Sequence, residues 1–255
     1  MRLSTHGIVS ADGFRPDRLD DLAFWADANY RQKVLQSSGS LESPASPGNP
    51  VIRWLPVGGR YTPFGDSFEQ DTKSMRPTYV EDGNGRWLSF DGVDDEMELT
   101  PVPSATDTAY TLFLLISRPR SGWYFGSLGT SGQSGNPGSF QIERDGSDIR
   151  SRFRSDGDTN VSISGGQVTD NSTHLVTLAS DGGGQQMWVD GGSAGTLDSP
   201  SEGRFAQICL GRANQSDSTQ RGEVRIGTLV LYLRDLAASE RADVEHFILS
   251  QRGLT

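Results

Sequence analysis

The feature that most constrains the fold is a series of short apolar segments, each bounded by turn-forming residues, that begins at residue 86. Gly, Asp and Ser dominate the intervening turns, as in RDGSD, SDGGG and VDGG. Many short strands at this spacing indicate an all-β fold, a two-sheet antiparallel β-sandwich (jelly roll), rather than alternating strands and helices. The expected strands cover residues 86–90, 96–99, 109–117, 123–128, 139–144, 149–155, 161–164, 174–180, 185–190, 205–211 and 224–233.

A short helix is expected near the C-terminus, in the segment AASERADVEHFILSQRG. Val244, Phe247 and Ile248 recur there at helical spacing, which places them on one apolar face. Gly253 is suited to end the helix, because glycine readily adopts the left-handed conformation of a C-terminal cap. Asp235 is the expected cap at the other end.

The chain has 255 residues, a length that fits one large all-β domain. Residues 1–15 are expected to form a polar N-terminal arm, and residues 16–255 the jelly-roll domain. Residues 37–50 are rich in Ser, Pro and Gly, which predicts an exposed loop. Cys209 is the only cysteine, so an intrachain disulfide is excluded. The N-terminal segment lacks the apolar stretch of a secretory signal, so synthesis in the cytoplasm is expected.

The formal net charge of −10 limits the classes of partner. Such a surface repels phosphate backbones and anionic lipid headgroups, so nucleic acid is not an expected partner. The longest apolar run, residues 110–116, has the length of a strand and falls far short of the ~20 residues of a transmembrane helix. Membrane insertion is therefore not expected.

Four segments, taken in order, carry a resemblance to a known family. The first ends with Leu22, Trp25 and Asp27, and the second contains an Arg-Pro pair followed by Phe-Asp-Gly and paired aspartates. Together they resemble laminin G-like jelly-roll domains of the concanavalin A-like lectin/glucanase superfamily. The segments are FRPDRLDDLAFWADA, RPTYVEDGNGRWLSFDGVDDEMEL, HLVTLASDGGGQQMWVDG and ICLGRANQSDSTQRGEVRIGTLVLYLRDLAASERADVEHFI.

The resemblance implies two curved antiparallel sheets packed face to face, and it implies no single function. Versions without a signal peptide look similar to bacteriophage virion proteins of tails, fibres or capsid decoration. The leading expectation is therefore a non-enzymatic virion module, a homo-oligomer attached to other virion proteins, with host cell-surface glycan as a further partner. The alternatives are a polysaccharide lyase or hydrolase, and a free calcium-dependent lectin.

The acidic run SFDGVDDEMEL, residues 89–99, admits two interpretations. Asp91 and Gly92 are typical of a tight turn, because Asp bonds its own backbone and Gly tolerates a positive φ. Asp91, Asp94 and Asp95 are also candidate calcium ligands, although calcium takes six to eight oxygens and the EF-hand spacing is absent. No other cofactor is indicated.

Side chains alternate along the strand that follows this turn. Met97 and Leu99 are expected to face the core, and Glu96 and Glu98 the solvent. Glucanases of the superfamily carry three acids on one strand face, and position 100 supplies no third acid here. The run therefore indicates no catalytic residue.

An arginine row is unusual in so acidic a chain. Arg150, Arg152 and Arg154 lie on one face of their expected strand, with no acid between them. Gln141 and Glu143 precede them on another strand, a partial match to alginate-lyase-type members that lacks the histidine of those enzymes. One interpretation is a solvated strand face. The other is a contact for an anion or a uronate, since Arg binds carboxylates bidentately.

Aromatic residues divide into expected core and candidate platforms for a sugar ring. Those expected in the core are Trp25, Trp87, Phe90, Phe113, Trp188 and Phe205. Those near loops, where a ring could stack on a sugar, are Trp54, Tyr61, Trp123 and Tyr124. Of the loop set, Trp123 and Tyr124 are the candidates for ligand binding.

The histidines and serines suggest no catalytic or zinc site. His6, His174 and His246 lie far apart and lack the close spacing of a zinc set. The segment GTSGQSG contains no nucleophile elbow and is typical of a loop.

Overall fold

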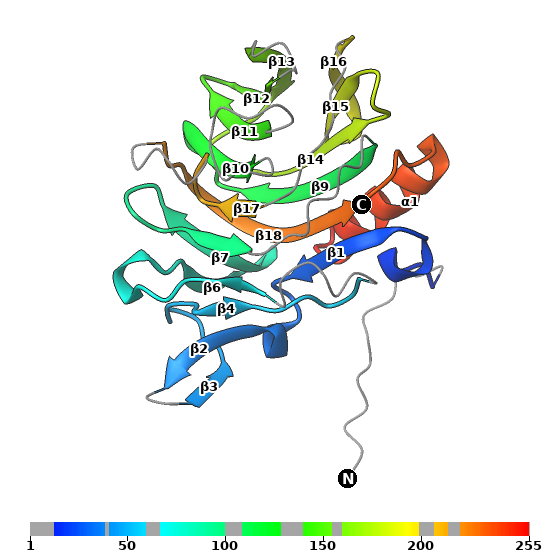
Figure 1. The fold of residues 1–255 in the computed structure, drawn as a ribbon. Coiled ribbons are helices and arrows are strands. Elements are labelled where there is room, and N and C mark those ends of the chain that lie inside the picture. Colours follow the sequence, from blue (N-terminus) through cyan, green and yellow to red (C-terminus); the bar gives the residue numbers. More distant parts are fainter. Residues whose placement is uncertain are drawn as a thin grey trace.

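The computed structural model describes residues 13–38, 41–59, 67–99, 109–128, 140–154, 160–198, 207–213 and 220–254. Within these ranges, two antiparallel sheets pack face to face and one α-helix follows the last strand (Figure 1). The predicted β-sandwich with a short C-terminal helix is confirmed. No helix of these described ranges is long and apolar enough to cross a membrane.

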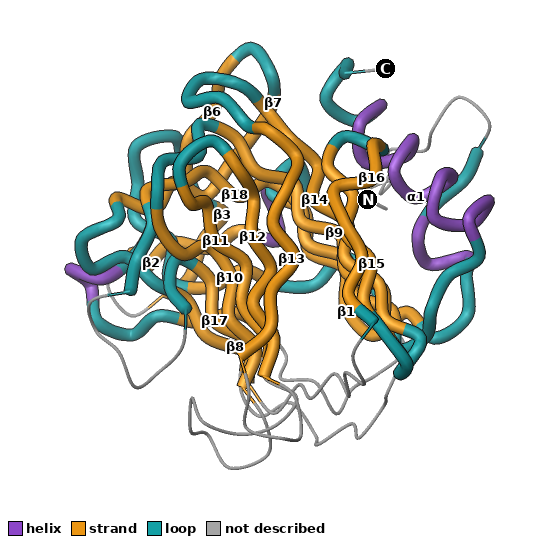
Figure 2. The backbone as a smooth tube through the Cα atoms, turned by 90° about the horizontal axis from the view of Figure 1, so that it is seen from above, coloured by secondary structure: helices purple, strands orange, loops and turns teal. Residues whose placement is uncertain are grey.

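Sheet A carries the helix on its outer side. Its strands, in spatial order, are β16 (Gly192–Leu197), β15 (Gln185–Val189), β14 (Thr173–Ser180), β9 (Tyr110–Ser117), β18 (Glu223–Tyr232), β7 (Gly85–Asp91) and β6 (Thr78–Asp82), and β1 (Leu22–Asp27) also pairs with β18. The helix α1 (Ala238–Ser250) lies outside this sheet, on the opposite side of the sandwich from β10–β13 (Figure 2).

Sheet B forms the other layer. Its strands, in spatial order, are β13 (Asn160–Gln167), β12 (Asp148–Arg154), β11 (Phe140–Asp145), β10 (Gly122–Leu128), β17 (Gln207–Leu210), β8 (Met97–Leu99), β5 (Phe68–Glu69), β4 (Arg53–Trp54), β2 (Val34–Ser38) and β3 (Leu41–Pro44). Three short 3₁₀ turns accompany the sheets, at Pro16–Arg18, Arg31–Lys33 and Lys73–Met75.

The central strand β9 is buried on both faces, which explains its unbroken apolar sequence. Leu112 and Leu114 point between the sheets into the main core. Phe113 and Leu115 point outward and belong to a second core beneath α1. The helix supplies its predicted apolar face to this second core, with Phe247 against Trp25 at a ring-centre distance of 5.5 Å.

Most of the predicted core aromatics are confirmed. Trp25, Trp87, Phe90, Phe113 and Trp188 are buried. Phe205 lies outside the described residues.

One of the aromatic residues predicted to stack on a sugar ring is buried in the core, and another lies outside the described residues. Trp54 is fully buried and packs beside Phe68, with ring centres 6.0 Å apart. Its ring therefore belongs to the core and is closed to a sugar. Tyr61 lies outside the described residues.

The predicted exposed loop at residues 37–50 is wrong in part. Leu41–Pro44 form β3, which pairs with β2 as an edge hairpin. The Ala45 N–H then donates to the Val34 carbonyl at 2.8 Å. Backbone pairing at a sheet edge needs few apolar side chains, so a Ser- and Pro-rich composition does not exclude it. Of the predicted arm, only residues 13–15 fall within the described ranges.

The sequence predicts the C-terminal end of α1 correctly and its N-terminal cap wrongly. Gly253 adopts the predicted positive φ, 64°, and the Leu254 N–H closes onto the Leu249 carbonyl at 3.1 Å. At the first turn, the Glu240 carboxylate accepts the Ala237 N–H at 3.0 Å, so the predicted capping by Asp235 is wrong. A carboxylate three residues into the helix performs that task.

A buried ion pair joins the end of the chain to sheet A. Arg252 is fully buried, and its Nη2 donates to Asp27 Oδ1 and to the Gly227 carbonyl, each at 3.1 Å. Its Nη1 donates to the Arg86 carbonyl at 2.7 Å. The guanidinium also lies 4.5 Å from the ring centre of Trp87. One side chain thus holds β1, β7 and β18 together.

Replacing Arg252 with Met is expected to lower the free energy of unfolding by ~3–5 kcal/mol, because Asp27 would be left buried without its cation. Adding Asp27→Asn to Arg252→Met should recover part of that loss. Urea denaturation measures both. The same substitution at exposed Arg18 is the control, expected within ~0.5 kcal/mol of the unmodified protein. A loss below ~1 kcal/mol for Arg252→Met would contradict the interpretation.

Candidate functional site on the outer face of sheet B

The outer side of β10–β13 forms a polar face because apolar and polar side chains alternate along these strands. On β11, Phe140 and Ile142 enter the core while Gln141 and Glu143 point outward. The register places Gln141 opposite Arg152 on β12. The outward side chains that make up this polar face are Trp123, Gln141, Glu143, Arg150, Arg152, Ser162 and Ser164.

Glu143 lies between two of the predicted arginines. Its Oε1 is 2.7 Å from Arg152 Nε and 3.4 Å from Arg150 Nη1. Arg150 also forms an ion pair with Asp145. Burial raises the pKa of Glu143, and the two arginines oppose that shift. Arg150 and Arg152, which have no acid between them in sequence, are therefore charge-paired by acids of the neighbouring strand.

Arg152 and Trp123 come together as part of one arrangement. The guanidinium lies 4.8 Å from the ring centre of Trp123, and this stacking leaves the indole only 9% exposed. The Arg152 side chain keeps 43% of its surface exposed. Trp123 thus supports the arginine and is not itself an open platform for a sugar. The third arginine of the row, Arg154, ends β12, and its side chain lies outside the described residues.

The prediction that Tyr124 contacts a ligand is wrong. The register of β10 against β11 shifts between Trp123 and Phe125, and Tyr124 sits at this irregularity. Its side chain turns into the main core and is fully buried, with its hydroxyl donating to the Arg120 carbonyl. Burial raises the pKa of the Tyr124 hydroxyl further above its ordinary value. No part of the ring faces a ligand.

The prediction that Glu96 and Glu98 face solvent is wrong for Glu96, whereas Glu98 keeps 24% of its side chain exposed. Met97 and Leu99 do enter the core as predicted, and both glutamates share the outer side. Glu96 is only 6% exposed, and the side chains of Arg212 and Arg221, two residues joined by an isolated antiparallel bridge, contact its carboxylate.

These two arginines form ion pairs with both glutamates. Arg221 Nη2 lies 2.6 Å from Glu96 Oε2, and Arg212 Nη1 lies 3.3 Å from the same oxygen. Arg212 also pairs with Glu98. The partners are more than a hundred positions apart in the chain, so local sequence spacing carries no signal of the contact.

A small recess of about 280 Å³ opens beside these glutamates. It is lined by Ser67, Glu69, Gln70, Asp71, Glu96 and Glu98. Carboxylates dominate this lining, so the recess disfavours an anionic ligand. Arg152, the most exposed arginine of the polar face, does not line this recess.

The predicted turn at Asp91 is confirmed. Asp91 Oδ1 accepts the backbone N–H groups of Val93 at 2.8 Å, Asp94 at 3.2 Å and Asp95 at 3.3 Å. Gly92 adopts the expected positive φ of 75°. In return, Asp95 Oδ2 accepts the Asp91 N–H at 3.0 Å. The aspartates therefore satisfy the backbone of the turn.

The same turn brings the three candidate calcium ligands together. One carboxylate oxygen from each of Asp91, Asp94 and Asp95 lies within 4.8 Å of the others. Burial, together with the charge of Asp91, raises the pKa of Asp95 to about 7. Because Asp91 Oδ1 already accepts three N–H groups, it has little capacity left for a cation. The hydrogen bonds of the aspartates explain the turn without a bound calcium ion, and calcium binding stays a prediction.

The sequence did not predict a Ser–His–Asp chain of hydrogen bonds that the structure contains. Ser172 Oγ lies 2.7 Å from His174 Nε2, and His174 Nδ1 lies 2.7 Å from Asp190 Oδ2. The turn itself uses these groups: the Thr169 N–H also reaches Nε2 at 3.3 Å, and Ser172 Oγ donates to the Thr169 carbonyl at 3.1 Å. The chain therefore braces residues 169–172 against β14 and the turn after β15.

Comparison with known proteins identifies the fold and leaves the family open. No family model matches the chain, and no curated protein matches it in sequence. Among solved structures, a sialidase from Trypanosoma rangeli in complex with 2,3-difluoro-KDN is similar, with a TM-score of 0.57 and 15% identity. The similarity covers 91% of this chain but only 33% of the sialidase chain.

Two further solved structures share the fold. Domain 4 of a GH43 extracellular arabinanase from Geobacillus stearothermophilus, in complex with arabinotriose, has a TM-score of 0.54 and 14% identity, covering 89% of this chain and 98% of that one. The receptor binding domain of botulinum neurotoxin C/D mosaic serotype has a TM-score of 0.52 and 11% identity, covering 89% and 51%. At such identities the likeness concerns the β-sandwich alone.

Asp95→Asn is expected to stabilise the protein in a pH-dependent way. The unfolded carboxyl ionises near its ordinary value of 3.8 and the folded one at about 7, so the unfolded state holds fewer protons between these values. Stability of the unmodified protein therefore falls as the pH rises through this window. At about pH 8 the variant should gain ~1–2 kcal/mol, allowing for solvent screening.

Urea denaturation at about pH 8 and about pH 4 measures this effect. Most of the gain should disappear at the lower pH, where the folded carboxyl is protonated and the unfolded one is only partly ionised. Asp243→Asn, at an exposed position on α1 far from this turn, is the control and should change the stability by no more than ~0.5 kcal/mol at either pH. An equal gain for Asp95→Asn at both pH values would contradict the interpretation.

Proposed function

We propose that the chain is a non-enzymatic glycan-binding module whose polar face binds an acidic sugar. The observation that carries the proposal is the exposed edge of Arg152, held in place by Trp123 beneath it and by Glu143 at its Nε. A guanidinium fixed in this way is oriented before a carboxylate arrives, so less side-chain entropy is lost on binding.

The neighbours of Arg152 suit the hydroxyl groups of a sugar. Across the strands, Gln141 and Ser162 stand directly opposite Arg152, and Ser164 stands opposite Arg150. These amide and hydroxyl groups can both donate and accept hydrogen bonds. Carboxylate recognition by one arginine, flanked by such groups, is the chemistry of a uronate or another acidic sugar.

The likeness to solved structures supports the glycan class at the level of fold. Domain 4 of the arabinanase is described in complex with arabinotriose, a sugar. That domain is similar over nearly its whole length. Because one fold hosts many functions, the polar face of this chain carries the argument and the likeness adds to it.

Arg152→Gln is expected to weaken binding of oligogalacturonates by about tenfold or more, since a charge-assisted pair is lost. Isothermal titration calorimetry measures the affinity. Arg18→Gln removes the same charge from an exposed site beside sheet A and should leave the affinity unchanged. Equal weakening by both variants would reduce the effect to net charge and contradict the proposal.

A polysaccharide lyase is the second candidate, because Gln141, Glu143, Arg150 and Arg152 share the polar face. In the same titrations, the ultraviolet absorbance of an unsaturated product distinguishes the two functions. Binding without product supports the binding module. Product formation that Glu143→Gln abolishes would replace it with the lyase.

We further propose that the module belongs to a phage virion, as a homo-oligomer attached to other virion proteins. Its support is the resemblance of the sequence to jelly-roll domains of that kind, with a polar segment ahead of the domain. Mass spectrometry of particles of the encoding phage should find the chain in a fixed ratio to the capsid protein. Absence from particles, with a monomer in light scattering, would contradict this part.

A further inference from the structure

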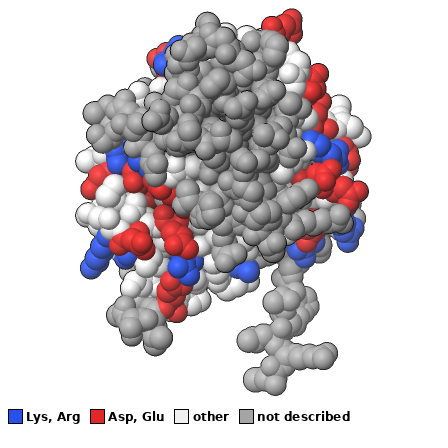
Figure 3. Space-filling view, in the orientation of Figure 1, with Lys and Arg blue, Asp and Glu red and all other residues white. Residues whose placement is uncertain are grey.

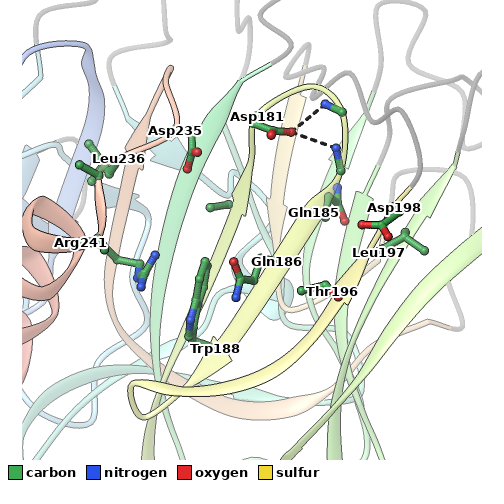
Figure 4. Close-up of a pocket in the computed structure, with 15 residues that line it drawn as sticks. Asp181, Gln185, Gln186, Trp188, Thr196, Leu197, Asp198, Asp235, Leu236 and Arg241 are labelled. Atoms are coloured by element: carbon green, nitrogen blue, oxygen red, sulfur yellow. Dashed lines mark hydrogen bonds between the residues drawn. The ribbon is translucent and has the colours of Figure 1, made fainter.

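A groove lies on the outer side of sheet A, on the opposite side of the sandwich from the polar face, where the start of α1 meets β15 and β16. Its volume is about 680 Å³, within the range of ligand sites. The turn between β14 and β15 forms one end, strands β15 and β16 form the floor, and the segment that leads into α1 forms a wall (Figure 4).

The floor and wall combine an aromatic ring with polar groups. Arg241 of α1 lies 3.7 Å from the ring centre of Trp188 on β15. Gln186 and Thr196 stand opposite each other on β15 and β16, and both line the groove. An amide and a hydroxyl on the floor offer hydrogen bonds to a ligand that carries hydroxyl groups.

Acidic side chains outweigh basic ones in this groove. Three carboxylates line it, from Asp181, Asp198 and Asp235, and Arg241 is the one cationic side chain among the described lining residues. Arg241 is already stacked on Trp188, and its Nε lies 3.8 Å from Glu245. The groove therefore presents a negative potential, which favours a cation and disfavours the acidic sugar proposed for the polar face.

Two of these carboxylates are placed at the same end of the groove. Asp181 Oδ1 accepts the N–H groups of Gly183 at 2.8 Å and Gly184 at 3.0 Å, which fixes the side chain and lowers its pKa (Figure 4). Burial raises the pKa of Asp235, and the charge of Asp181 adds to that shift. A cation bound between the two would relieve their repulsion.

A bare metal ion does not fit this spacing. Among the described residues, the acidic group close enough for one ion is the Asp91 turn, and the groove carboxylates do not form such a group. A ligand that spans the groove, with a positive group at the Asp181 end and hydroxyls over the floor, matches both the paired carboxylates and the polar floor. Glu240 holds the Ala237 N–H, so the start of α1 offers no competing anion site.

We infer that this groove binds an amino sugar, with its protonated amine between Asp181 and Asp235 and its hydroxyl groups over Gln186 and Thr196. The site is separate from the polar face. A chain with both sites would bind glycans that carry acidic and amino sugars at two different surfaces.

Calorimetric titration with a glucosamine tetramer, its N-acetylated counterpart and trilysine tests the inference. The glucosamine tetramer should bind, and acetylation should weaken binding about tenfold or more because it removes the positive charge. Trilysine, which supplies amines without sugar hydroxyls, should bind more weakly than the glucosamine tetramer. Equal affinity for the two tetramers, or tighter binding of trilysine, would overturn the inference.

Paired variants locate the site. Asp181→Asn with Asp235→Asn should weaken glucosamine-tetramer binding about tenfold or more, because both charges are lost while the amide oxygen at 181 still accepts the turn N–H groups. Asp243→Asn, on the exposed side of α1, should have no effect. An unchanged thermal midpoint shows that the double variant is folded. Equal weakening by Asp243→Asn would overturn the inference.

The two binding surfaces are distinguished by crossing the experiments. Arg152→Gln should leave glucosamine-tetramer binding intact, and the Asp181/Asp235 double variant should leave oligogalacturonate binding intact. In NMR spectra, the indole N–H resonance of Trp188, assigned through Trp188→Phe, should move with the glucosamine tetramer. A resonance that stays fixed at saturation would place the ligand elsewhere and overturn the inference.

Discussion

The buried guanidinium of Arg252 is the contact on which the arrangement of sheet A and its helix depends. It joins Asp27 of β1, the backbone of β7 and the backbone of β18 at one point. Gly227 permits this approach, because a methyl group there would lie 2.7 Å from the ring of Trp87 and 2.8 Å from Arg252 Nη2. The last turn of the chain is therefore held to the sheet by a charge that water does not reach, and α1 is fixed over the second core.

The position of α1 explains why one outer side of the sandwich is largely apolar and covered. The helix covers the outer side of β9 and β18, whose strands are accordingly apolar on both faces. Among the described residues, no helix lies over the outer side of β10–β13, and the outer side chains of these strands are polar and form the polar face. Where the start of α1 meets β15 and β16, a groove remains. One element thus accounts for a closed core, an open face and a groove.

Charge pairing on a local scale matters more here than the net charge. The chain carries a net charge of −10, yet its proposed acidic-sugar site is built from arginines. Glu143 and Glu96 each hold two arginines close to the sheet. On the described surface in view, acidic and basic side chains lie side by side (Figure 3). Whether a site favours an anion or a cation therefore depends on which side chain keeps an exposed edge.

Most strands from β7 onward, the helix with its Gly253 end, the buried Met97 and Leu99 and the Asp91 turn follow from sequence, because alternation and turn chemistry act over a few residues. The fate of Glu96 does not follow, since Arg221 reaches it from 125 positions away. Nor does the burial of Tyr124, which depends on a register shift between two strands. Edge pairing of β3 and the groove beside α1 likewise arise from elements distant in the chain. Contacts of that kind are set by how the sheets stack, and no local pattern encodes them.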